Sequence, residues 1–183
     1  MKKQILVYGI VLLSVFVSCR KSENTPDKTK PDNISFEQFN KTIIATAYDS
    51  IPGCCKYIIF NITGDLTNGY EAYLSSNSIP ILCDGGDQFL VDEKTNQIKV
   101  LTENTKISEN GTWTHNTKLY LDQFAGQGEK YIGSRMLSYP SGEYIYHYGW
   151  IKIKLSANKD TLTILNRATN QTEFNNLLTG QIN

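Results

Sequence analysis

From residue 56 onward, the chain alternates between short apolar runs and clusters of turn-forming residues. The breaks include Asn68-Gly69 and Asn110-Gly111, whose backbones favour tight turns. The apolar runs are Lys56 to Thr63, Tyr70 to Leu74, Gln88 to Asp92, Ile98 to Thr102, Lys118 to Leu121, Lys130 to Tyr139, Tyr144 to Leu155 and Thr161 to Asn166. Eight runs at this spacing predict an all-β fold, either an antiparallel β-sandwich or a barrel-like pair of sheets.

The stretch just before these runs has a pattern that fits two kinds of element. Phe36, Phe39 and Ile43 have the spacing of a helical stripe, whereas residues 42–46 have the composition that opens a strand. The pattern leaves the choice between helix and strand open for residues 34–47.

The two longest runs predict a β-hairpin at the centre of the fold. Residues 131–139 and 144–155 flank a turn in which Pro140 fixes φ and Gly142 accepts a positive φ. Successive side chains of a strand point to opposite faces of the sheet. The second strand therefore has an aliphatic face, which we expect in the core: Ile145, His147, Gly149, Ile151, Ile153 and Leu155. Its other face carries Tyr144, Tyr146, Tyr148, Trp150, Lys152 and Lys154.

The aromatic face of this strand is the candidate binding face. Left in water, Tyr144, Tyr146, Tyr148 and Trp150, together with Trp113, form a flat platform for sugar rings or a partner chain. The alternative is that a second sheet or a loop covers the rings. That arrangement is the more common one, because cross-strand aromatic packing is an ordinary device of sheets.

The N-terminal residues predict export and lipidation. A basic head, an apolar stretch from Ile5 to Val17 and a small-residue cleavage site before Cys19 are typical of a signal peptide. The apolar stretch is shorter than the ~20 residues that a membrane-spanning helix needs, so a permanent anchor is the weaker interpretation. The segment resembles a bacterial lipoprotein signal, in which the sulfur of Cys19 is acylated with palmitate-type chains. The alternative is a plain secreted protein.

The next residues predict a tether. Residues 20–33 contain two prolines and no large apolar side chain, so they bury too little surface to offset the entropy of ordering. Fully extended, they reach ~45 Å. We therefore divide the chain into a cleaved signal (1–18), a lipidated cysteine with a flexible tether (19–33) and a single β-sandwich domain (34–183). The predicted location is the outer membrane of the cell envelope. The sequence pattern does not indicate which leaflet carries the lipid.

Composition and charge narrow the partners. Eleven tyrosines and two tryptophans suit strands, whose pleated surfaces pack flat rings well. The 18 basic residues balance the 18 acidic ones and form no clustered basic face, so we expect no nucleic-acid partner. The expected partners are the membrane, through the lipid on Cys19, and a glycan or an envelope protein.

Three further cysteines suggest a disulfide. Outside the cytoplasm, Cys54 or Cys55 can pair with Cys83, which leaves one thiol over. The adjacent pair lacks the two-residue gap of a zinc knuckle, so we expect no metal site and no cofactor.

Residues for catalysis are sparse. His147 lies among core-facing positions, where a hydrogen-bonded structural role is expected, and His115 lies in a polar, turn-rich stretch. The chain has no nucleophile elbow, zinc-protease helix, Walker loop or dinucleotide fingerprint, so we do not expect an enzyme. The alternative is a glycan hydrolase whose acidic residues come from loops: Asp65, Asp84, Asp87 or Glu143.

The C-terminal third of the chain resembles a broad set of bacterial proteins. The segments 128–133, 147–153 and 162–168, with the terminal Gly180-Gln181, look like the Tyr-Gly-Trp and Gly-Gln tail of secreted or surface-attached β-sandwich proteins. The tether and lipid cysteine resemble lipoproteins of the Bacteroidota. The resemblance implies fold and location but no activity. We therefore expect a non-catalytic binding or envelope-accessory module, with a hydrolase or a purely structural envelope component as alternatives.

Overall fold

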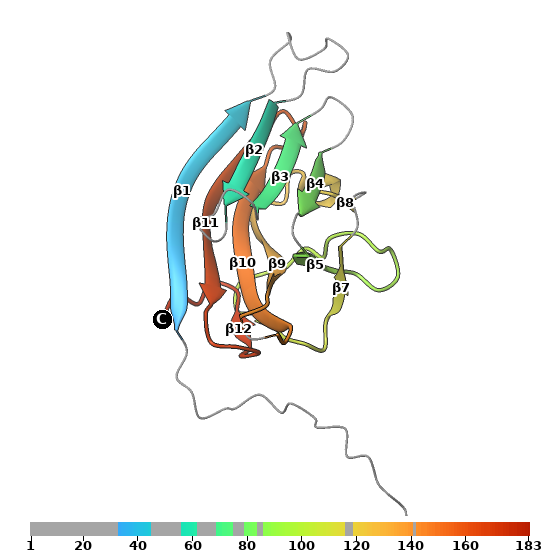
Figure 1. The fold of residues 1–183 in the computed structure, drawn as a ribbon. Helices are drawn as coiled ribbons and strands as arrows, with labels where there is room; N and C mark the ends of the chain where they lie inside the picture. Colours follow the sequence, from blue (N-terminus) through green and yellow to red (C-terminus); the bar gives the residue numbers. More distant parts are fainter. Residues whose placement is uncertain are drawn as a thin grey trace, which may run out of the picture.

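The computed structural model describes residues 33–44, 56–61, 69–74, 79–83, 86–115, 119–140 and 142–183, and within them the protein is all-β (Figure 1). The strands are β1 (Ile34–Ile44), β2 (Lys56–Asn61), β3 (Gly69–Leu74), β4 (Pro80–Cys83), β5 (Gln88–Val91), β6 (Lys106–Ile107), β7 (Thr112–Thr114), β8 (Leu119–Tyr120), β9 (Glu129–Ser138), β10 (Ile145–Leu155), β11 (Thr161–Asn170) and β12 (Leu177–Leu178). One 3-10 turn, η2 (Asp122–Phe124), precedes β9.

The strands form a sandwich of two main sheets. The larger sheet has the order β1-β11-β10-β9-β5-β7, and the smaller one has the order β2-β3-β4-β8. A third, two-stranded sheet pairs β12 with β6. All of the paired strands are antiparallel, so the predicted fold class is confirmed. Figure 1 shows β2, β3 and β4 lying in front of the upper half of the larger sheet.

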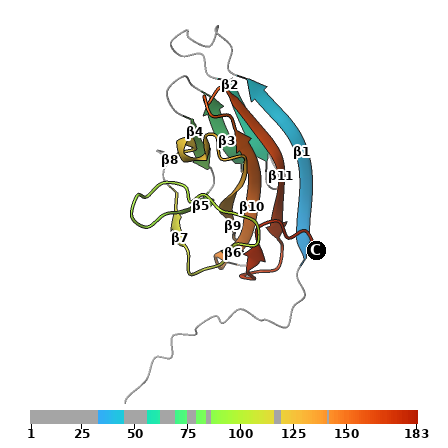
Figure 2. The same ribbon diagram turned by 180° about the vertical axis from the view of Figure 1, so that it is seen from behind.

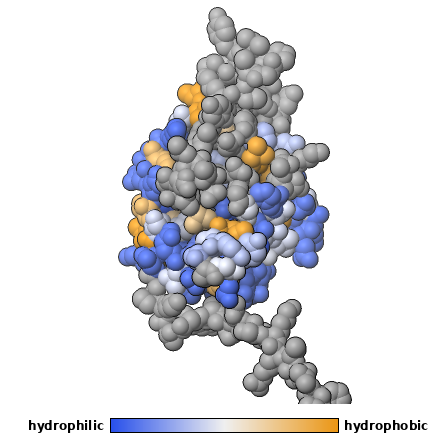
Figure 3. Space-filling view, viewed as in Figure 1, coloured by the Kyte–Doolittle hydropathy of each residue, from blue (hydrophilic) through white to orange (hydrophobic). Residues whose placement is uncertain are grey.

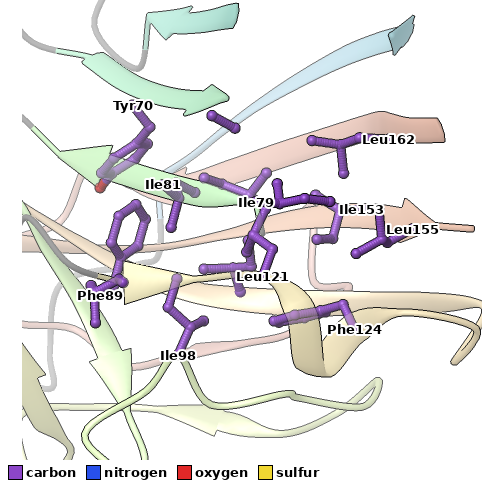
Figure 4. Close-up of a cluster of buried hydrophobic side chains, with 14 of the residues drawn as sticks. Tyr70, Ile79, Ile81, Phe89, Ile98, Leu121, Phe124, Ile153, Leu155 and Leu162 are labelled. Carbon is purple, nitrogen blue, oxygen red and sulfur yellow. The ribbon is translucent and has the colours of Figure 1, made fainter. Parts of the chain in front are cut away.

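The main core fills the space between these two sheets. Tyr70 and Ile81 reach it from the smaller sheet, and Phe89 and Ile153 reach it from the larger one (Figure 4). The rings of Tyr70 and Phe89 lie 4.5 Å apart between centroids. Burial of such side chains contributes about 1.5–3 kcal/mol each, so this layer is the principal source of stability.

A second hydrophobic cluster lies on the opposite face of the larger sheet. It contains Leu90, Leu101, Ile107, Tyr131, Tyr148, Trp150, Ala168 and Leu177. Seen from behind, the chain between β5 and β7, including β6, crosses this face (Figure 2). A bridge between Leu101 and Tyr131 and the pairing of Leu177 with Ile107 hold that cover in place. Part of the larger sheet is therefore buried on both faces.

The central hairpin of β9 and β10 agrees with the prediction. Its register runs from the pair Ile145 and Ser138 to the pair Lys154 and Glu129. Gly142 in the turn has φ of 87°, which a residue without a Cβ adopts without strain. The two faces of β10 separate as expected, because Ile151 contributes to the main core and Trp150 to the second cluster.

Residues 34–44, which the pattern left undecided, form the edge strand β1. Phe36 contacts Trp150 on one face of the sheet, whereas Phe39 and Ile43 pack against the main core on the other. The apolar residues thus serve two faces of a strand, and their helix-like spacing does not reflect one stripe.

Other short elements differ from the prediction. Ile98 to Thr102 forms isolated bridges at Ile98 and Leu101 and no strand. The strands β4, β6, β7 and β12 were not predicted; they have two to four residues, too few for a clear alternation.

On the face shown in Figure 3, the coloured residues are largely hydrophilic, with separate hydrophobic patches.

Candidate functional site

Four of the five aromatic residues of the candidate binding face belong to the second cluster or pack against it, and Tyr144 directly precedes β10, but their exposure differs greatly. Tyr144 is 68% exposed, whereas Tyr148 is 1% and Trp150 is 2% exposed. Tyr146 and Trp113 are half-buried. The exposure of the rings therefore falls from Tyr144, in solvent, to Trp150, in the interior.

The inner end of this face is part of the interior. The ring of Trp150 meets Tyr131 edge-on, with 5.3 Å between centroids, and Phe36 lies 6.3 Å from it. The indole Nε1 of Trp150 donates a hydrogen bond to the backbone oxygen of Gln181, at 3.2 Å. A buried indole with its N–H satisfied is a packing residue. Trp150 and Tyr148 are therefore not available as a surface.

The outer end is the tip of the β9–β10 hairpin. Tyr139 and Tyr144 flank the turn, and their rings pack with centroids 4.9 Å apart. Tyr139 is 60% exposed, so both rings of this pair present apolar area to solvent. The next row toward the interior holds the cross-strand pair Leu137 and Tyr146, both half-buried.

Between the two ends lies Arg135 on β9, opposite Tyr148 on β10. Its guanidinium carbon is 4.0 Å from the centroid of Tyr146 and 4.9 Å from that of Trp113. Arginine cations over aromatic faces are attracted by the quadrupole of the ring. Gln88 Oε1 accepts hydrogen bonds from Nε of Arg135, at 2.8 Å, and from Nη2. These contacts hold the guanidinium plane in one orientation.

The surroundings of Arg135 change the electrostatics of the site. Partial burial lowers the pKa of Arg135, because desolvation disfavours the charged form. Burial also raises the pKa of Tyr148, and the nearby Arg135 opposes that rise. Glu109 raises the pKa of Tyr148 further, but the structure records no ion pair between Glu109 and Arg135.

Trp113 on β7 completes the site. Its ring lies 5.7 Å from that of Tyr148, and its Nε1 donates to the backbone oxygen of Ser108 at 3.2 Å. We call the accessible part of this face the aromatic-arginine surface and define it as five residues: Trp113, Arg135, Tyr139, Tyr144 and Tyr146.

Sequence reasoning missed two of these residues, Arg135 and Tyr139. Arg135 is on β9 opposite Tyr148, and Tyr139 directly follows β9, where its ring packs against Tyr144. Extending the two-residue alternation across the turn would have found them.

The two histidines lie elsewhere. His147 points toward the main-core side of the sheet, and its Nε2 shares a hydrogen bond of 3.1 Å with Ser138 Oγ on the neighbouring strand. His115 is exposed, and its Nδ1 lies 2.8 Å from the backbone oxygen of Asp87. The hydrogen-bonded inward position expected for His147 is confirmed.

The structure describes two of the four acidic residues of the hydrolase alternative, Asp87 and Glu143. Asp87 is buried, and its Oδ1 accepts a hydrogen bond from the backbone N–H of Leu137 at 3.1 Å. Glu143 is exposed in the hairpin turn. Asp65 and Asp84 lie outside the described residues.

The lipidation and disulfide predictions also concern residues outside the described part of the chain. Cys19, Cys54 and Cys55 are not described, and Cys83 is described only through its backbone at the end of β4. Both predictions stay predictions. Within the described ranges, no three His, Cys, Asp or Glu side chains gather as a metal site would require. The same ranges contain no helix long and apolar enough to span a bilayer.

Comparison with known proteins found no matching family model, no matching curated protein and no matching solved structure.

Proposed function

We propose that the protein is a lipid-anchored module of the cell envelope that binds a glycan, without catalysis, through the aromatic-arginine surface. The observation that carries this proposal is the pair of Tyr139 and Tyr144, whose rings pack together and are 60% and 68% exposed at the tip of the β9–β10 hairpin. Monomeric proteins bury most large rings, so a paired and exposed set on one face marks an interaction site.

The chemistry of the surface suits a sugar. Tyrosine and tryptophan combine a flat apolar body with a polar tip, which matches the apolar ring face and the hydroxyl rim of a saccharide. Tyr146 and Arg135 are on paired strands, and Tyr139 and Tyr144 directly adjoin them, so little conformational entropy is lost when a ligand binds.

The proposed location rests on the N-terminal sequence. A signal segment that ends at Cys19, followed by a polar tether, would hold the domain close to the membrane, which we propose is the outer membrane. The membrane is then one partner, through the lipid, and the glycan is the other.

A binding screen tests the proposed ligand class. The full-length protein is applied to a glycan array, and positive binders are titrated by calorimetry. The double variant Tyr139→Ala, Tyr144→Ala is expected to lose at least about tenfold in affinity, because truncation of an aromatic residue that anchors a ligand typically costs about 2 kcal/mol or more. Leu178→Ala removes an exposed apolar side chain from β12 and serves as the matched control.

A screen in which no glycan binds, with the protein folded, would contradict this proposal. Binding to an envelope protein that depends on the same two tyrosines would replace the glycan by a protein partner.

The lipid anchor has its own test. Cells fed an alkyne-labelled palmitate are expected to label the wild-type protein and not Cys19→Ala, and the variant should leave the membrane fraction. Equal labelling of both proteins would contradict lipidation at Cys19.

A purely structural role in the envelope is the second candidate. The observation that favours it is the burial of Tyr148 and Trp150, which a structural component predicts for the whole face. The two proposals make different predictions for the variant Tyr139→Ala, Tyr144→Ala. A purely structural component should keep its role in the envelope when both tyrosines are replaced, whereas a binding module should lose affinity for its ligand.

A further inference from the structure

We infer that the ligand of the aromatic-arginine surface is an acidic oligosaccharide, one that carries carboxylate groups, and that Arg135 is the residue that binds a carboxylate. This inference rests on the proposed function and adds the charge and the minimum size of the ligand.

The charge of Arg135 has no opposite charge paired with it among the described residues. The other described arginine, Arg167, pairs with Glu37 at 2.5 Å, and Lys152 pairs with Glu129 at 2.7 Å. No carboxylate in the described part of the chain forms an ion pair with Arg135, although it is half-buried. A partly desolvated cation without a counter-charge gains more from an arriving anion than a solvated one does.

The guanidinium of Arg135 is held in one orientation by its neighbours. Gln88 accepts hydrogen bonds from Nε and from Nη2, and the hydroxyl of Tyr148 also interacts with the group. A guanidinium has five N–H donors in a planar fork, so N–H groups on the outer end remain for a ligand. Tyr146 and Trp113 lie against the group and hold its plane. A pre-oriented fork is the geometry that binds a carboxylate with two parallel hydrogen bonds.

The span of the surface sets the size of the ligand. The backbone of Arg135 is opposite that of Tyr148, but its guanidinium lies against the ring of Tyr146, 4.0 Å from the centroid. Tyr144 is two residues before Tyr146, a separation of about 7 Å at the rise of a β-strand. A ligand that contacts the guanidinium and covers the rings of Tyr139 and Tyr144 therefore extends beyond one sugar ring. The surface fits a chain of at least two sugars, with a carboxylate at Arg135 and a neighbouring sugar ring over the tyrosine pair.

Matched ligands test the inference without any change to the protein. Full-length protein is titrated with oligomers of galacturonate, with alginate oligomers and with the carboxyl-reduced, neutral form of each. The acidic oligomers are expected to bind at least about tenfold more tightly than their reduced forms, because hydrogen bonds to charged groups contribute about 1.5–3 kcal/mol. The monomers are expected to bind at least about tenfold more weakly than the oligomers.

Two variants assign the effect to Arg135. Arg135→Gln is expected to bring the affinity for the acidic oligomer down to that of the reduced one and to leave the reduced one within about twofold. Lys152→Gln removes the same charge from the same face, but from a cation that already has a carboxylate partner, so its affinity should match the wild type. Circular dichroism and thermal unfolding establish that each variant is folded.

The outcomes separate this inference from the proposed function. Equal binding of acidic and reduced oligomers would overturn the inference and leave the glycan-binding proposal standing. An acidic preference that Arg135→Gln retains, or that Lys152→Gln loses equally, would overturn the role of Arg135. Binding of neither form, together with a blank array, would overturn the proposed function itself.

Discussion

The two ends of the aromatic face have the same alternating sequence, but one end is buried and the other is exposed to solvent. At the inner end, Trp150 is 2% exposed and its N–H is satisfied by the backbone oxygen of Gln181. At the outer end, Tyr144 is 68% exposed and its ring packs against that of Tyr139, which is 60% exposed. The comparison teaches that alternation decides which face a ring points to, but not whether that face meets water.

The difference arises from the cover. Ile107 of β6 and Leu177 of β12 pair with each other and pack into the cluster that contains Trp150. Arg135 and Tyr146 lie between the covered and the open ends, where a half-buried cation replaces a fully apolar contact. The face therefore changes from apolar to polar side chains at the point where β6 and β12 no longer cover it.

The largest expected effect comes from the inner end. Trp150→Ala removes a fully buried ring between Tyr131 and Phe36, and it leaves a cavity that the paired strands cannot close. We expect a loss of about 3–5 kcal/mol in the free energy of unfolding, measured by urea denaturation. A loss below about 1 kcal/mol would mean that the inner end is not core.

The second effect concerns the cover. Leu177→Ala truncates a buried residue of β12, and we expect a loss of about 2–3 kcal/mol. In a Trp113→Phe background, the emission of Trp150 should shift to the red and become more easily quenched by acrylamide. An unchanged, protected emission at the same loss of stability would show that other residues cover Trp150.

A smaller effect is expected from the ion pair on the same face. Lys152 Nζ lies 2.7 Å from Glu129 Oε2, and this contact lowers the pKa of Glu129 below its usual 4.5. The pair therefore stabilises the fold above that pH, and the contribution is lost as the pH falls through the lowered pKa. Glu129→Gln should cost about 0.5 kcal/mol at pH 7, since Glu129 is half-exposed.

Chemical denaturation between pH 7 and pH 3 measures this contribution. The wild type and Glu129→Gln should converge in stability at the acidic end. A difference that stays constant with pH would show that the variant acts through packing and not through charge.

The smallest effect on stability is expected at the hairpin tip. Tyr144→Ala removes an exposed ring that has one aromatic neighbour, so the free energy of unfolding should change by about 0.5 kcal/mol or less. Thermal unfolding beside Trp150→Ala gives the direct comparison. A loss as large as that of Trp150→Ala would contradict the description of the tip as a surface.

Prediction from the sequence was most successful where the strands are long. The β9–β10 hairpin and its two faces could be predicted because ten or more residues repeat the alternation on each side of a Pro-x-Gly turn. For β1, the apolar residues Phe36 and Phe39 pack on opposite faces of the sheet, which is why the pattern left the choice between helix and strand open. The two-residue strands β6 and β12 carry no readable pattern.

For the candidate site, the sequence alone was enough to predict that the aromatic rings share one face of the strand, because successive side chains of a strand point to opposite faces. Only the tertiary structure decided that Tyr148 and Trp150 are interior, that Tyr144 is surface, and that Arg135 lies beside Trp113 and Tyr146. The reason is distance along the chain. The cover of Trp150 comes from residues near 107, 177 and 181, and contacts over such separations depend on the packing of the whole sandwich.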